Sequence, residues 1–118
     1  MAIGRRYQRL MVWRTAMELV TEVYRVTGSF PDTEKFGLMT QMRRAAVSLP
    51  SNIAEGSGRG SDKEFIRFLR IARGSLFELE TQIEIAQRLG FIGQSDTLSE
   101  QIEHLFAMLN NLTQKLKP

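Results

Sequence analysis

Apolar residues recur every three or four positions along almost the whole chain, which is the spacing of one face of an α-helix. The clearest series has intervals of 4-3-4-3-4: Leu98, Ile102, Leu105, Leu109, Leu112 and Leu116. No stretch alternates apolar and polar residues as a half-buried strand does. The chain has 118 residues, enough for a core without disulfides or metals. We therefore predict one all-α domain over residues 1–118, an antiparallel up-down-up-down four-helix bundle.

The first helix carries two apolar stripes, which together cover roughly 200° of its circumference. The stripes are Leu10, Trp13, Met17, Val20 and Tyr24, and Val12, Ala16, Leu19, Val23 and Val26. One bundle core needs a narrower stripe, so we expect a second partner on this helix. We assign Val12, Leu19 and Val23 to an interface between subunits. Gly28 is expected to end the helix in a left-handed cap.

The remaining helices are bounded by turn and cap residues. The second helix is expected to begin near Thr33, to kink at Pro50, which cannot donate a helix hydrogen bond, and to stop at Gly56. The third is expected to begin at Ser61 with a capping box and to run about 28 residues. Ser95 is expected to begin the fourth.

The stretch NIAEGSGRGSDKEF, residues 52–65, has three glycines at alternate positions. It lacks the Lys-Ser/Thr ending of a Walker loop, and a helix precedes it where a dinucleotide loop needs a strand. The glycines therefore indicate a hinge between two helices. One further possibility stays open, because free amides at the start of the third helix, beside Arg59 and Lys63, attract an anion.

Arginine dominates the basic residues: there are twelve arginines and four lysines, and the net charge is +3. On the third helix Lys63, Arg67, Arg70 and Arg73 lie away from the apolar stripe, and acids follow them. The macrodipole favours the reverse order. Three interpretations remain: a solvated charged face, head-to-tail packing of subunits, or a phosphate-binding strip.

These charges define two sets of candidate residues. The candidate nucleic-acid contacts are Arg5, Arg6, Arg43, Arg44, Arg59, Lys63, Arg67 and Arg70. Besides the apolar residues of the first helix, the candidate subunit contacts are Arg73, Glu78 and Glu84.

The composition argues against catalysis. The chain has no cysteine and one histidine, His104, which rules out thiol chemistry, Cys-ligated zinc and a multi-histidine metal site within one chain. We therefore expect no enzyme activity, catalytic residue, metal or cofactor. With no signal peptide and no apolar run of about 20 residues, we expect a cytoplasmic location and no membrane contact.

Three stretches share a family resemblance: LMVWRTAMELVTEVY, FPDTEKFGLMTQMRRAAVSLPSNIAEGSGR and EFIRFLRIARGSLFELETQIEIAQRLG. In this order, and followed by a leucine-rich helix, they resemble the family of proteins encoded in intervening sequences of bacterial 23S ribosomal RNA genes. The resemblance covers almost the whole chain. It extends to the accessory variability determinant of diversity-generating retroelements, a relative with a basic surface that is associated with nucleic acid.

The resemblance implies a four-helix bundle that assembles as a ring, typically a homopentamer, and it brings no enzymatic activity. Arg43, Arg44, Asn52, Glu55 and Arg59 fall on the family's signature stretches. Two functions stay open: an oligomeric accessory protein that binds RNA or DNA, and a protein–protein scaffold whose arginines serve subunit contacts.

Overall fold

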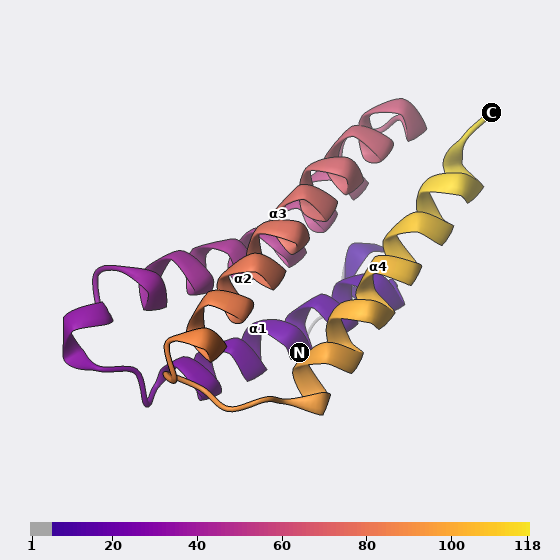
Figure 1. The fold of residues 1–118 in the computed structure, drawn as a ribbon. Helices are drawn as coiled ribbons and strands as arrows, with labels where there is room; N and C mark the ends of the chain where they lie inside the picture. The colour runs from indigo at the N-terminus through magenta and orange to yellow at the C-terminus, as the bar shows by residue number, and fades with distance from the viewer. Residues whose placement is uncertain (1–5) are drawn as a thin grey trace.

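The structure, a computed structural model, describes residues 6–118, which form four long helices and two short 3₁₀ helices (Figure 1). The long helices are α1 (Met11–Thr27), α2 (Leu38–Ser57), α3 (Asp62–Arg88) and α4 (Asp96–Leu116). The 3₁₀ helices η1 (Arg6–Arg9) and η2 (Asp32–Glu34) precede α1 and α2. The described residues contain no strand. The predicted all-helical chain with four long helices is therefore confirmed.

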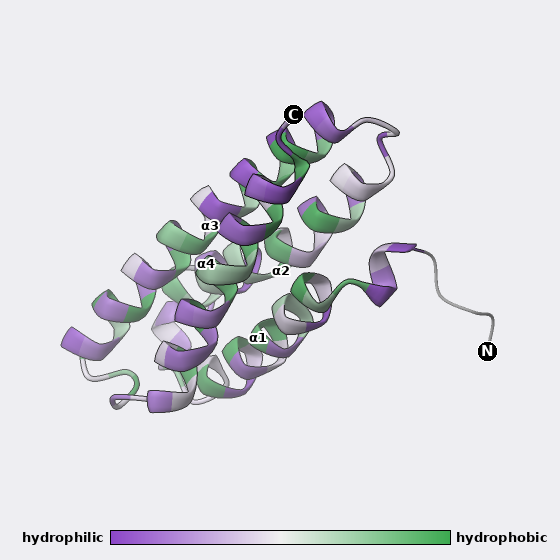
Figure 2. Ribbon diagram, turned by 90° about the vertical axis from the view of Figure 1, so that its right-hand side faces the viewer, coloured by the Kyte–Doolittle hydropathy of each residue, from purple (hydrophilic) through white to green (hydrophobic). Residues whose placement is uncertain are grey.

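Each long helix packs on the helices next to it in the sequence, and α4 also packs on α1. The most extensive contact joins α2 to α3, which the short glycine turn connects. Figure 2 shows the hydrophobic sides of the helices turned toward one another. No helix among residues 6–118 is long and apolar enough to cross a membrane.

The chain's own core covers one of the two apolar stripes of α1, the one that contains Val12, Leu19 and Val23. Val12, Leu19 and Val23 are 4%, 0% and 0% exposed and belong to the hydrophobic core cluster of the described residues. The assignment of these three residues to a subunit interface is therefore wrong. In the other stripe, Met17 and Tyr24 stay exposed, whereas its remaining residues are partly buried against the core: Leu10, Trp13 and Val20.

Two of the three predicted helix starts are confirmed by their caps. The Ser61 hydroxyl accepts a hydrogen bond of 3.2 Å from the amide of Glu64, and α3 begins at the next residue. The Ser95 hydroxyl accepts one of 3.2 Å from the amide of Leu98 at the start of α4. Each hydroxyl satisfies one of the amides that a helix start leaves without a partner.

The start of α2 was predicted wrongly. Thr33 lies within η2, and α2 begins at Leu38, whose amide donates to the carboxylate of Glu34 at 3.2 Å. The cap is thus a glutamate four residues back. The left-handed cap expected at Gly28 is also wrong, since this residue has helical angles, φ −61° and ψ −22°.

Gly56 was predicted to stop α2, but the helix continues to Ser57 and Gly58 follows it as the cap. Gly56 is buried, and a methyl group on it would lie 2.6 Å from Cβ of Phe68. The residue therefore allows α2 and α3 to approach closely. The turn depends on Gly60, whose φ is +86°, a value that glycine adopts at little cost. Pro50 lies inside α2, which continues past it.

Candidate nucleic-acid interface

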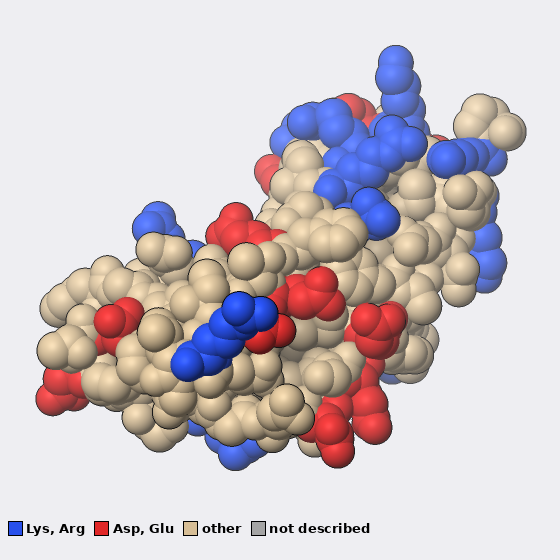
Figure 3. All heavy atoms as spheres, viewed as in Figure 1, with Lys and Arg blue, Asp and Glu red and all other residues tan. Residues whose placement is uncertain are grey.

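Basic side chains gather at one end of the molecule. Figure 3 shows the largest group of them where Figure 1 places the turn from α2 to α3 and the end of α4, with a few acidic side chains beside it; acidic side chains and smaller groups of basic ones are spread over the rest of the face shown. The exposed basic residues of this end are Arg59, Lys63, Arg67, Arg70, Lys115 and Lys117. The change from basic to acidic side chains that was expected along α3 is thus also a change from one end of the molecule toward the other.

Arg59 and Arg67 cover the ring of Phe68, from the turn and from α3. Their guanidinium carbons lie 4.9 and 4.7 Å from the ring centroid. Arg59 also pairs with Glu55 at 3.2 Å, and Arg67 pairs with Glu64 at 3.1 Å. The hydrogen bond from Arg67 lowers the pKa of Glu64. Both arginines are held in place, and both stay exposed to solvent.

Lys63 and Arg70 line a hollow between the start of α3 and the end of α4, together with Lys115 and Lys117. Its volume is about 520 Å³. The two terminal lysines were missing from the sequence-predicted site. Their signal was the basic last turn of the fourth helix, but only the packing of α4 on α3 brings that turn beside Lys63.

Arg6, on η1, lines a second hollow of about 330 Å³ with the glycine turn and the start of α3, including Gly60 and Ser61. The 3₁₀ helix therefore extends the basic end toward the N-terminus. Arg5, which precedes Arg6 and was also predicted to contact nucleic acid, lies outside the described residues.

Arg43 and Arg44 lie elsewhere, on the first half of α2. Arg43 is about 21 Å along the helix from Ser57, at a rise of 1.5 Å for each of fourteen residues. Its Nε donates to the Thr27 hydroxyl at 2.8 Å, and its Nη2 donates to the carbonyl of Tyr24 at 3.3 Å. The guanidinium carbon lies 4.4 Å from the centroid of the Tyr24 ring.

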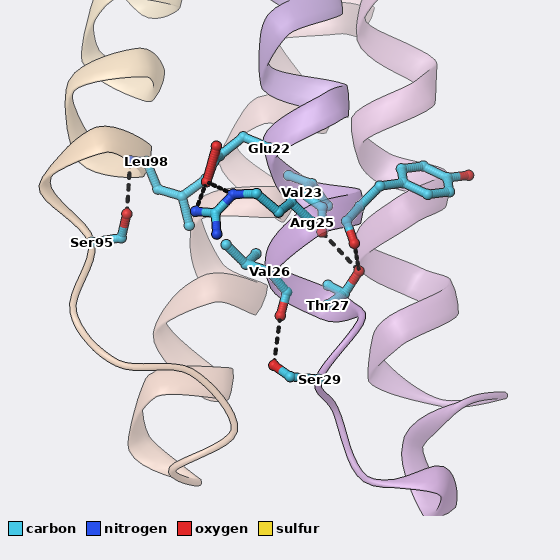
Figure 4. Close-up of polar contacts among 9 residues, drawn as sticks. Glu22, Val23, Arg25, Val26, Thr27, Ser29, Ser95 and Leu98 are labelled. Carbon is cyan, nitrogen blue, oxygen red and sulfur yellow. Dashed lines mark hydrogen bonds and ion pairs between the residues drawn. The ribbon is translucent and has the colours of Figure 1, made fainter.

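Arg43 therefore satisfies the end of α1, where carbonyls lack helix partners and a cation is favourable. Figure 4 shows the Thr27 hydroxyl at this end, where it donates to the Val23 carbonyl at 2.7 Å. Thr27 is fully buried. We therefore assign Arg43 a structural role at the end of α1. Arg44 is exposed and lines a groove with Tyr24 and Val47, apart from the basic end.

The predicted subunit contacts of α3 are all exposed, but their surroundings differ. Arg73 stacks on the ring of Phe77, 4.9 Å from its centroid. Glu84 pairs with Arg88 at 3.1 Å, and Glu78 accepts a bond from Gln82 at 3.2 Å. Further toward α4, a hollow of about 450 Å³ is lined by the carboxylates of Glu80, Glu84 and Glu103. The same pair of helices thus carries a basic hollow at one end and an acidic one at the other.

His104 is exposed on α4, without a hydrogen-bond partner. Residues 6–118 hold no group of three or more side chains that would bind a metal ion.

Comparisons with known proteins agree with the fold and with the resemblance to the intervening-sequence family. The chain matches a crystal structure from Bacteroides thetaiotaomicron with a TM-score of 0.63 and 23% identity, over 90% of this chain and 94% of that chain. That protein belongs to the S23 ribosomal protein family and is described as having unknown function. No curated protein matches. The model of the 23S rRNA-intervening sequence protein family matches residues 8–111, and the chain therefore belongs to this family.

Proposed function

We propose that the protein binds RNA or DNA, without catalysis, through the basic end formed by the α2–α3 turn, the first half of α3 and the end of α4. The observation that carries this proposal is the gathering of six exposed cations from two distant parts of the sequence on one surface. Phosphate contacts by Lys and Arg supply most of the affinity of non-specific nucleic-acid binding. The resemblance to the retroelement accessory proteins supports this role. We also propose that the protein acts in the cytoplasm.

The test is fluorescence anisotropy with a labelled RNA hairpin at several salt concentrations. The variant is Lys63→Glu with Arg70→Glu, because both side chains are exposed and neither is bonded to an acid among residues 6–118. The matched control is Lys35→Glu with Arg88→Glu, which changes the charge equally outside the basic end. Each lost phosphate contact should flatten the slope of log K against log salt by about 0.9 for a duplex, so we expect about 2 for the pair.

Equal weakening by the variant and its control would mean that net charge alone matters and would refute a localised interface. Absence of binding by the unmodified protein at low salt would refute the nucleic-acid proposal as a whole.

We also propose that the bundle is up-down-up-down and that copies of it associate. The closed order of packing, from α1 through α2 and α3 to α4 and back to α1, supports the first point. Exposed apolar residues support the second: Met17 and Tyr24 on α1 are 41% and 44% exposed, and Val47 on α2 is 41% exposed. If association is the main function, the protein is a scaffold. For a scaffold whose arginines serve subunit contacts, light scattering should then show that Met17→Glu and the variant of Lys63 and Arg70 both lower the oligomer mass, while the latter variant leaves the affinity for nucleic acid unchanged.

A further inference from the structure

The hollow between the start of α3 and the end of α4 has a composition that distinguishes it from the rest of the basic end. It is lined by Lys63, Arg70, Lys115 and Lys117, with Asp62 as its one acidic side chain. Ile66, which is 8% exposed, and the half-buried Leu116 add apolar wall. Four cations and one anion leave its side chains with a net charge of +3.

Unlike Arg59 and Arg67, the other cations of the basic end, the four cations of this hollow form no ion pair among residues 6–118. Arg25, Arg59, Arg67 and Arg88 each form an ion pair with a glutamate three or four residues away. No ion pair or side-chain hydrogen bond joins any of the hollow's four cations to an acid within residues 6–118. Like charges beside a low-dielectric wall repel one another and raise the local concentration of anions. A bound anion would relieve that repulsion.

We propose that this hollow binds the phosphate monoester at the end of a nucleic-acid strand. The inference rests on the proposed function and names the group that this part of the basic end takes. A monoester carries about −1.5 to −2 charges at pH 7, more than the single charge of a backbone phosphate, because its second pKa is about 6. It therefore suits a concave site lined by four cationic side chains and one acidic side chain better than a phosphodiester does. No aromatic side chain lines the hollow, so it offers no ring on which a base could stack.

The test compares three RNA duplexes of one sequence with a 5′-phosphate, a 3′-phosphate or only hydroxyl ends, in competition with a labelled hydroxyl-ended duplex. A terminal phosphate held by charge-assisted bonds should bind about tenfold tighter than the hydroxyl end. The two phosphorylated arms tell which end is taken, and a preference for either one supports the proposal. Equal binding of all three duplexes would overturn it.

Variants separate this inference from the wider one. Lys115→Gln with Lys117→Gln should abolish the preference for the phosphorylated duplex while Arg59 and Arg67 still bind the backbone. The control, Lys35→Gln with Arg88→Gln, should keep the preference. Binding of the duplexes without a preference for a phosphorylated end would refute only the assignment of the hollow. Absence of binding to any duplex would refute the proposed function as well. A preference that survives in the Lys115 and Lys117 variant would place the phosphate elsewhere and refute the assignment.

The charge of the ligand gives a second readout. Below about pH 6 a monoester loses its second charge. The preference for the phosphorylated duplex should therefore shrink there, because the charge of the ligand itself falls. Asp62 is the one acidic side chain that lines the hollow, where its carboxylate repels a bound anion. Asp62→Asn should accordingly bind the phosphorylated duplex more tightly at pH 7, and weaker binding by this variant would contradict the proposal.

Discussion

Substitution of Gly56 by alanine tests the close approach of α2 and α3. In an ordinary helix this change is favourable, because alanine has the higher helix propensity, by about 1 kcal/mol. Gly56 is buried, and an added Cβ would lie 2.6 Å from Cβ and 3.3 Å from Cγ of Phe68, and 3.1 Å from Cδ1 of Phe65. The nearest of these atoms is fixed to the backbone of α3, so a rotamer change does not relieve the contact.

The helices would have to move apart or bend. Overpacking of this kind costs about 1–3 kcal/mol, and a clash with a Cβ atom belongs at the upper end of that range. Subtraction of the gain of about 1 kcal/mol in helix propensity leaves a net loss of about 2 kcal/mol. The expected sign is therefore opposite to the one that the helix position alone would give.

Urea unfolding followed by far-ultraviolet circular dichroism measures the free energy of unfolding of each variant. Gly74→Ala is the matched control, since Gly74 lies inside α3 and a Cβ added there meets no atom within 4 Å. The control should be more stable than the unmodified protein by up to about 1 kcal/mol. A Gly56→Ala protein as stable as the control would refute the reasoning, because it would show that the two helices separate at no cost.

The remaining predictions concern single polar contacts. Thr27→Val removes the acceptor of the 2.8 Å bond from Arg43 Nε, and unfolding in urea should show a loss of about 1–2 kcal/mol; an unchanged midpoint would contradict the role given to Arg43. Ser95→Ala should cost about 1 kcal/mol in the same assay, because it removes the cap of α4. The pKa of Glu64 is lowered chiefly by its hydrogen bond from Arg67, so its stabilising contribution is present above the ordinary pKa of 4.5 and is lost as the pH falls through the folded value. Glu64→Gln should therefore lose less stability on acidification than the unmodified protein, as measured by thermal unfolding at several pH values; identical acid profiles would show that the pair contributes nothing.

Helix positions were predictable where local chemistry decides them. Ser61 and Ser95 cap α3 and α4 as expected, because a serine hydroxyl reaches amides only three residues away. The start of α2 was missed because its cap is the longer side chain of Glu34, within a region that first forms a 3₁₀ turn. Gly56 was misread because a glycine that ends a helix and one that admits a neighbouring helix look the same in a sequence.

The candidate site was predictable in its residue types and not in its grouping. Arg59, Lys63, Arg67 and Arg70 are neighbours in the sequence, and they meet on one surface. Arg43 was grouped with them because it is an arginine on a polar helix face, yet it is engaged at the end of α1 through Thr27. That bond joins residues sixteen positions apart, and no local pattern indicates it.

The sequence by itself determined four amphipathic helices, two of their caps and the change from basic to acidic along α3, because each depends on residues within a few positions of one another. Only the tertiary structure decided that Val12, Leu19 and Val23 belong to the chain's own core, since burial depends on which helices surround a face. It also decided that Lys115 and Lys117 stand beside Lys63. The glycine stretch shows both sides: its composition indicated a turn, whereas the packing of Gly56 against Phe68 made it the place where two helices touch.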